Sequence, residues 1–185
     1  MTAEIADNLG GKQTMKILLG VFMGLTLVML STGSQAGELA LAHTDPAWKD
    51  GKGKVPDIGI CEARNVGGKG MSPSIEVTGI PSGTVKLELH FTDEDWYVGE
   101  GAHGVVGFPV PAGSKSVIVP SFKGETDKLP ANIEAISSHE AQMLAGGVYL
   151  GPCSNGRGHN YTVYVYAKNA DGKKLAKGKL PLGQY

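Results

Sequence analysis

A nine-residue stretch near the end of the chain, NYTVYVYAK at residues 160–168, constrains the fold more than any other part of the sequence. Aromatic and β-branched residues dominate it, and apolar side chains fall on both faces of a strand of period two. A strand of this kind is covered on both sides, so we expect it in the middle of a sheet. Asp171-Gly172 follows, a pair typical of a tight hairpin turn because both residues tolerate positive φ. Residues 173–180 are therefore predicted to return as its antiparallel partner.

Further strand patterns occur earlier in the chain. Residues 85–92 alternate with period two, which is typical of a half-buried strand. The predicted inward face of this strand consists of Val85, Leu87, Leu89 and Phe91. Shorter strand candidates are residues 55–60, 103–110 and 116–119.

One segment, residues 132–144, has a helical pattern, with Asn132 as a possible N-cap and an interrupted apolar stripe. Glycine is abundant, with 28 among 185 residues and no collagen-like period, which favours a fold rich in turns. The chain is therefore predicted to be mainly β: an antiparallel β-sandwich with one or two short helices, in a single domain.

The N-terminal region has the layout of a secretory signal peptide. Residues 17–30 form an uncharged run of 14, shorter than the ~20 residues of a membrane-spanning helix. Small residues at Ser34 and Ala36 suit a cleavage site, so we expect residues 1–36 to be removed. The acidic start favours Met15 as the true first residue, and an uncleaved anchor is the alternative. A loosely held lead-in at 37–54 and a domain at 55–185 would then form a periplasmic or secreted protein with no membrane span.

Charge and motifs exclude several function classes. The 17 basic and 18 acidic residues give a net charge of -1, without the basic excess of a nucleic-acid-binding protein. His139-Glu140 begins like a zinc-protease helix, but Met143 occupies the second ligand position. The glycines of residues 99–104 match G-x-G-x-x-G but precede a strand instead of a helix. We therefore expect no cofactor, no metal and no catalytic residues.

Two polar segments at strand ends favour a binding site for a small anion. Asp93 and Asp95 follow the alternating strand, and His103 comes shortly after them. A glycine- and proline-rich loop leads to His159 and Tyr161, whose side chains share one side of a strand. Two imidazoles, a phenol and loop N–H groups could bind a phosphate or a carboxylate. Asp93 could accept a hydrogen bond from one imidazole and raise its pKa.

The order of these segments resembles the phosphatidylethanolamine-binding protein family, which includes the bacterial Raf-kinase-inhibitor-like proteins. The likeness covers residues 61–168, and the pieces that carry it are Ser72-Pro73, Asp93-x-Asp95, His103, Gly151-Pro152-Cys153 and His159-x-Tyr161. The resemblance implies a β-sandwich with a small anion pocket at one end. It also implies binding of phosphate-like or carboxylate groups or phospholipid head groups. A periplasmic protein-binding inhibitor, for example of a protease, is the alternative, and a hydrolase comes third.

By matching position, the pocket would use Asp93, His103, Gly151, His159 and Tyr161. Pro152 would shape the loop, and Asp95 is expected to hold the loop. Arg157 either contacts the anion or solvates the loop tip. Two departures from the family, Ala102 before the pocket histidine and Ser154-Asn155 in place of two prolines, keep these donors but loosen the loop.

The two cysteines, Cys61 and Cys153, are expected to form a disulfide. An exported protein meets an oxidising compartment, and the family fold would bring Cys61 near the pocket loop. Two buried free thiols are the alternative. Among the aromatic residues, Trp96 would line the pocket or close one end of the sandwich. Tyr164 and Tyr166 would pack in the core or between the sheets. The other histidines, His43, His90 and His139, are expected on the surface.

Overall fold

The computed structural model of the chain describes residues 37–49 and 53–185. The signal peptide predicted at residues 1–36 therefore lies outside the described residues. Among these residues, the chain is mostly β with one short α-helix and one turn of 3-10 helix. The elements in chain order are β1 (Gly37–Glu38), β2 (Ala40–His43), α1 (Pro46–Lys49), η1 (Asp57–Gly59), β3 (Ile75–Thr78), β4 (Lys86–Asp93), β5 (Val105–Pro109), β6 (Ser116–Val119), β7 (Glu134–Ser137), β8 (Asn160–Lys168) and β9 (Lys174–Gln184).

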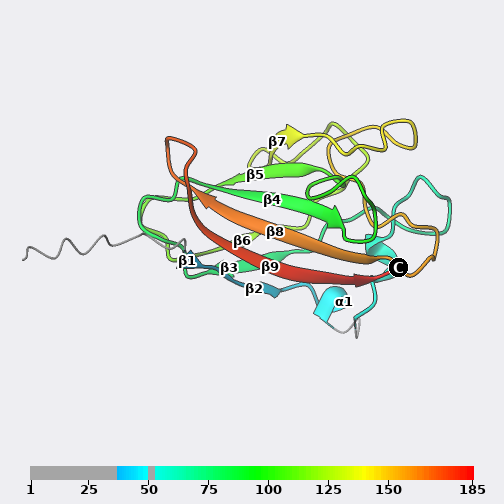
Figure 1. Ribbon diagram of the computed structural model, residues 1–185, viewed down its shortest axis with the longest axis horizontal. Helices are drawn as coiled ribbons and strands as arrows, with labels where there is room; N and C mark the ends of the chain where they lie inside the picture. The colour runs from blue at the N-terminus through cyan, green and yellow to red at the C-terminus, as the bar shows by residue number, and fades with distance from the viewer. Residues whose placement is uncertain (1–36, 50–52) are drawn as a thin grey trace, which may run out of the picture. The chain divides into compact units, whose positions relative to one another are not determined.

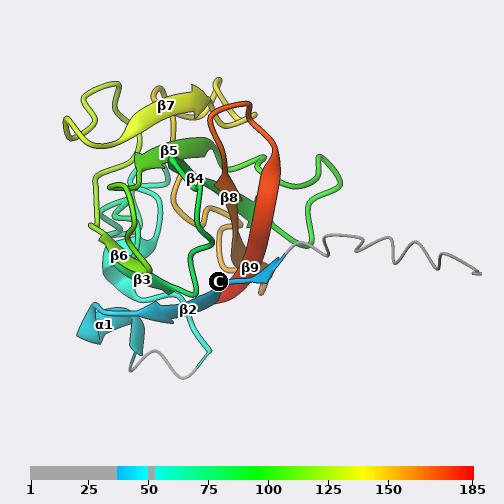
Figure 2. The same cartoon turned by 90° about the vertical axis from the view of Figure 1, so that its left-hand side faces the viewer.

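The strands form two sheets, as the sequence predicted (Figure 1). The larger sheet has six strands in the order β1-β9-β8-β4-β5-β7, and the smaller has three in the order β2-β3-β6. All neighbours are antiparallel except β1 and β9. Figure 2 shows β2, β3 and β6 together on one side and β4, β5, β8 and β9 on the other. The predicted mainly β, largely antiparallel sandwich is confirmed.

The core lies between the two sheets, and strand alternation explains which residues fill it. From β4, Leu87, Leu89 and Phe91 point inward and are at most 1% exposed. The facing sheet contributes Ile75 and Val77, which are fully buried. Burying a side chain of this size is worth about 1.5–3 kcal/mol, so this layer supplies much of the stability. Val85, predicted on the same inward face, is instead exposed at the start of the strand.

The hairpin at the end of the chain forms as predicted. β8 covers residues 160–168, and it pairs with β4 on one side and β9 on the other. The return strand β9 extends to Gln184, four residues beyond the prediction at Leu180. Strand β6 also matches its predicted limits, and β5 occupies the second part of the predicted strand at 103–110.

Three predicted segments differ from the structure. Residues 55–60 are not a strand, because Pro56 has no N–H to donate and the chain turns into η1. The predicted helix at 132–144 is wrong: residues 134–137 form β7, which pairs with β5 at the edge of the large sheet. Its apolar residues do not share a face, since Ile133 is buried while Met143 is fully exposed.

The predicted lead-in at 37–54 contains ordered strands. Gly37–Glu38 pairs with β9 in the large sheet, and Ala40–His43 pairs with β3 in the small sheet. Leu39, between them, is 3% exposed, and Trp48 of α1 is 5% exposed. This segment therefore belongs to the domain and connects its two layers. In the described part of the chain, no helix combines the length and apolar character needed to cross a membrane.

Candidate functional site

A cavity of about 260 Å³ lies at the end of the sandwich where β4 ends and β8 begins. In Figure 1 the loops of residues 60–70 and 150–158 lie beyond these strand ends. The cavity is lined by polar groups, Asp93, His103, Ser154, His159 and the arginines Arg64 and Arg157, and by Trp96, Ala141, Leu144, Leu150 and Cys153. Three of the predicted site residues, Asp93, His103 and His159, therefore converge on one cavity, together with Arg157.

Asp93 and His159 form the best-defined polar contact in the cavity. Antiparallel pairing of β4 with β8 places Asp93 opposite Tyr161, two residues after His159. The Nδ1–H of His159 donates to Oδ2 of Asp93 at 2.7 Å. Oδ1 of the same carboxylate accepts the backbone N–H of Asp95 at 2.9 Å, which fixes the turn after β4. The expected hydrogen bond between Asp93 and an imidazole is present, and it determines the orientation of the His159 ring.

His103 is held by a different contact. Its ring is almost fully buried, and Nδ1 donates to the carbonyl oxygen of Leu150 at 2.9 Å. Trp96 and Tyr161 contact it edge to face, with ring centroids 5.9 and 5.2 Å away. Burial lowers the pKa of His103 below its usual value, so the ring is neutral at neutral pH. With the proton on Nδ1, Nε2 is a hydrogen-bond acceptor rather than a donor.

Both arginines of the chain line this cavity, although they are 93 residues apart in the sequence. Neither Arg64 nor Arg157 forms an ion pair with a carboxylate within residues 37–49 and 53–185. Two guanidinium groups without a carboxylate partner are well suited to an oxyanion, which they can bind through paired N–H donors. The sequence reasoning missed Arg64. Its position three residues after Cys61 was the available signal, given the expected bond from Cys61 to the pocket loop.

The predicted disulfide between Cys61 and Cys153 is present, with Cα atoms 5.3 Å apart. The backbones of the two loops also meet here, because the N–H of Cys61 donates to the carbonyl oxygen of Pro152 at 3.0 Å. A Cβ on Gly151 would lie 2.5 Å from the carbonyl oxygen of Gly59, so only glycine fits there. Gly151 and Pro152 thus serve to bring the two loops together, and neither lines the cavity.

Tyr161 and Asp95 support the site from outside the cavity. The Tyr161 hydroxyl oxygen accepts the backbone N–H of Cys153 at 3.1 Å, and burial raises the pKa of Tyr161 to about 12. Asp95 accepts the N–H of Asn160 at 2.7 Å and its side-chain amide at 3.0 Å. The backbone hydrogen bond from Asn160 lowers the pKa of Asp95. Tyr161 therefore supports the pocket loop. Asp95 connects the end of β4 to the start of β8, in agreement with the prediction that it holds the loop.

Among four other aromatic and histidine residues, one lies where it was expected and three differ from expectation. Trp96 lines the cavity, one of the two positions foreseen. His139 was expected on the surface but is 1% exposed. Tyr164 and Tyr166 were expected in the core or in inter-sheet packing. Both lie on the outer face of the large sheet, where Tyr166 is buried and Tyr164 is half-buried. Their hydroxyls donate to Glu94 and Glu100, both at 2.9 Å.

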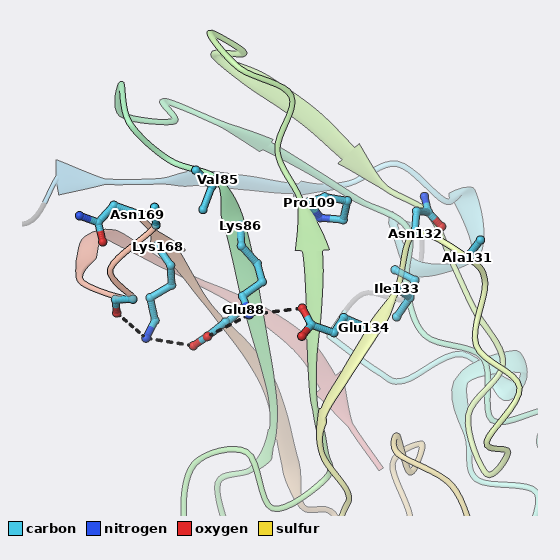
Figure 3. A pocket seen from close by; sticks show the side chains of 12 residues that line it. Val85, Lys86, Glu88, Pro109, Ala131, Asn132, Ile133, Glu134, Lys168 and Asn169 are labelled. Carbon is cyan, nitrogen blue, oxygen red and sulfur yellow. Dashed lines mark hydrogen bonds and ion pairs between the residues drawn. The ribbon is translucent and has the colours of Figure 1, made fainter.

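A larger hollow of about 660 Å³ lies at the opposite end of β4 and β8 (Figure 3). Its charged groups neutralise one another. Lys168 pairs with Glu88 at 3.1 Å, and Lys86 pairs with Glu134 at 3.3 Å. No group of histidine, cysteine, aspartate and glutamate side chains suited to a metal ion occurs among the described residues. The end with the two arginines is therefore the better candidate site.

Comparisons with known proteins identify the family and agree with the fold. The family model described as phosphatidylethanolamine-binding protein matches residues 44–184. Among solved structures, a similar one is YbcL of Escherichia coli, described as a new member of the mammalian PEBP family. The two are 19% identical with a TM-score of 0.54, and the match covers 80% of this chain and 98% of YbcL. At this identity the likeness to YbcL shows the fold alone. No curated protein sequence matches the chain.

Proposed function

The chain belongs to the phosphatidylethanolamine-binding protein family, and on that premise we propose that it is an exported protein that binds a small anion. The ligand is a phosphate, a carboxylate or a phospholipid head group, held in the cavity where β4 ends and β8 begins. The observation that carries the proposal is the convergence of Arg64 and Arg157 beside His103 and His159 in a single cavity. At about 260 Å³, this cavity is below the usual size of drug-binding pockets, which suits a small ligand.

Each polar group would have a definite role toward the anion. The two guanidinium groups would supply charge and paired N–H donors. Asp93 would hold the His159 ring in place through Nδ1. His103 enters binding neutral, with its proton directed at Leu150, so its Nε2 accepts a hydrogen bond. An anion that keeps one proton, such as monohydrogen phosphate, satisfies that acceptor without a change in protonation.

We propose binding without catalysis, and the contacts of Ser154 support this choice. Ser154 lines the cavity beside the Asp93–His159 pair, an arrangement that would suit a hydrolase. Its hydroxyl, however, donates to the carbonyl oxygen of Tyr185 instead of approaching an imidazole. Cys153, the other nucleophile type in the cavity, is joined to Cys61.

Titration calorimetry with phosphate, phosphoethanolamine and acetate tests the proposed ligand class. We expect wild-type protein to bind at least one of them, and the variant R64A/R157A to bind it more than tenfold more weakly, since each charge-assisted contact is worth about tenfold or more. K177A is the matched control, because it removes a positive charge on the outer face of β9, away from the cavity. Absence of binding in wild type, or equal affinity in the double variant, would refute the proposal.

The alternative of a protein-binding inhibitor also has an observation in its favour. Tyr97 and Met143 are almost completely exposed, at 96% and 105%, and both lie next to cavity-lining residues. Aromatic residues, methionine and arginine are enriched in protein interfaces. If this alternative holds, wild-type protein should inhibit a periplasmic protease that the variant Y97S/M143S does not inhibit. Equal inhibition by both, or inhibition by neither, would reject it.

Export is part of the proposal and rests on two observations. The apolar run at 17–30 and the small residues at 34 and 36 have the pattern of a signal peptide. The Cys61–Cys153 disulfide suits an oxidising compartment. Mass spectrometry of the protein isolated from the periplasm should give Gly37 as its first residue. Recovery of a form that still contains residues 17–30 would count against cleavage.

A further inference from the structure

We propose that Glu125 is a positioning residue that holds Arg64 at the cavity and so sets the affinity for the anion. Glu125 does not line the cavity, and it acts through the backbone of the turn that carries Arg64. The inference rests on the proposed function, since it concerns one of the two guanidinium groups of that site.

The contacts of Glu125 define this role. Its Oε1 accepts the backbone N–H of Glu62, and its Oε2 accepts the N–H of Ala63, both at 2.7 Å. These are the two residues directly before Arg64. The N–H of Asn65 donates to the carbonyl of Glu62 at 2.9 Å and closes the turn around Arg64. One carboxylate therefore binds two consecutive N–H groups of the turn, through charge-assisted hydrogen bonds that are stronger than neutral ones.

The backbone conformation of Glu125 would suit a glycine better than a residue with a side chain. Its φ is 56°, in the left-handed region that a residue other than glycine adopts only at a cost. The backbone N–H of Glu125 donates to the carbonyl of Tyr149 at 2.7 Å, adjacent to cavity-lining Leu150. A glycine would relieve the unfavourable φ but would lose both contacts to the Arg64 turn.

Space for the carboxylate depends on Gly70. A Cβ at residue 70 would lie 2.7 Å from Oε1 of Glu125, so any larger residue would displace the carboxylate. The neighbouring ion pair between Lys123 and Glu62 cannot replace the hydrogen bonds between Glu125 and the Arg64 turn. Both of its side chains are about half exposed, and such pairs contribute little to stability.

Electrostatics and positioning predict opposite signs for the loss of this carboxylate. Glu125 is negative and lies near an anion site, so removing its charge alone should leave anion binding unchanged or strengthen it. If Glu125 holds Arg64 in place, its removal should weaken binding, because a guanidinium on a loose turn must be ordered when the anion binds. The direction of the change therefore separates the two roles.

The test is a double-mutant cycle measured by calorimetry with inorganic phosphate. Its variants are E125A, E125Q, R64A and R64A/E125A. E140A is the matched control, because Glu140 is exposed and directly precedes cavity-lining Ala141. Its carboxylate makes no hydrogen bond to the Arg64 turn, which Glu125 binds. We expect R64A to bind phosphate about tenfold more weakly than wild type. E125A should bind phosphate at least about threefold more weakly than wild type, and the affinity of E125Q should lie between those of E125A and wild type. E140A should bind phosphate as well as wild type or better.

In the R64A background, E125A should have almost no further effect, because the group it positions is already absent. If E125A binds as tightly as wild type while R64A does not, the positioning role is refuted. Equal losses from E125A with and without Arg64 would refute it too, since they would reveal a general structural effect. If wild type does not bind phosphate but binds phosphoethanolamine or acetate, the same cycle is measured with that ligand. If it binds none of the three, the proposed function fails, and the role of Glu125 in anion binding falls with it.

Limited trypsin digestion gives a second measurement that does not depend on the ligand. Trypsin cleaves after arginine only where the chain opens locally. Cleavage after Arg64 should be several-fold faster in E125A than in wild type, while cleavage after Arg157 should be unchanged. Unchanged cleavage at both sites would show that Glu125 does not hold the turn. An increase at both would show that the whole domain is destabilised rather than this turn.

Discussion

Removal of the Cys61–Cys153 disulfide should weaken both the fold and the site, by an amount that follows from its span. The bond joins residues 92 positions apart. In the chain-entropy model, opening a loop of this length costs about 4.6 kcal/mol of unfolding free energy at 25 °C. For a domain near 150 residues this corresponds to a fall in Tm of about 9–18 °C. The variant C61S/C153S should therefore melt well below wild type in differential scanning calorimetry.

Loss of the disulfide should also weaken anion binding, because both arginines sit close to the two half-cystines. Arg64 follows Cys61 by three residues, and Arg157 follows Cys153 by four. Without the bond, the two loops must be ordered together when the ligand binds, and that ordering reduces affinity. A count of two free thiols per chain in denatured, unreduced protein would show that the disulfide is absent, and would refute this prediction. A Tm unchanged by reduction would refute the estimate of its contribution.

Two further predictions concern a glycine and the buried histidines. Gly151→Ala should cost roughly 1–3 kcal/mol of unfolding free energy in urea titrations, because its Cβ would lie 2.5 Å from the backbone of Gly59. The control Gly146→Ala should cost little, because the space around that residue is open. Burial lowers the pKa of His103 and His139 below the usual 6.5, so the unfolded chain takes up protons that the folded chain excludes. Unfolding free energy should hence be constant above about pH 7 and fall as pH drops below 6.5, by at most ~1.4 kcal/mol per pH unit for each histidine. A stability profile that is flat from pH 7.5 to 5.5 would contradict this assignment.

The sequence predicted the elements whose pattern is local. Residues 160–168 carry their own signature, an apolar run ended by an Asp-Gly turn, and they form β8. Residues 132–144 were misread as a helix because Ile133 and Ile136, three residues apart, fit a helical period, whereas pairing of residues 134–137 with β5 makes this segment a strand. Residues 40–43 gave no signal, since β2 is half exposed and is specified by its partner β3.

The site residues also fall into those that the sequence predicted and one that it did not. Asp93, His103 and His159 were found because they stand at strand ends within recognisable segments, and pairing of β4 with β8 brings two of them into contact. Arg64 was missed because it lies in an irregular turn without periodicity, where its spacing of three residues from Cys61 was the one available signal. Its place at the cavity depends on long-range contacts, the disulfide and the carboxylate of Glu125, which no local pattern shows.

The pairing of β1 with β9 has a consequence for the order in which the protein can form. Gly37 lies beside Ala176, so the first strand of the domain completes its sheet only against the last. A chain emerging from the ribosome therefore cannot close this sandwich until almost all of it has been synthesised. Until residues 174–184 have emerged, one edge of β8 therefore has no partner strand, and the large sheet has an open edge in its interior.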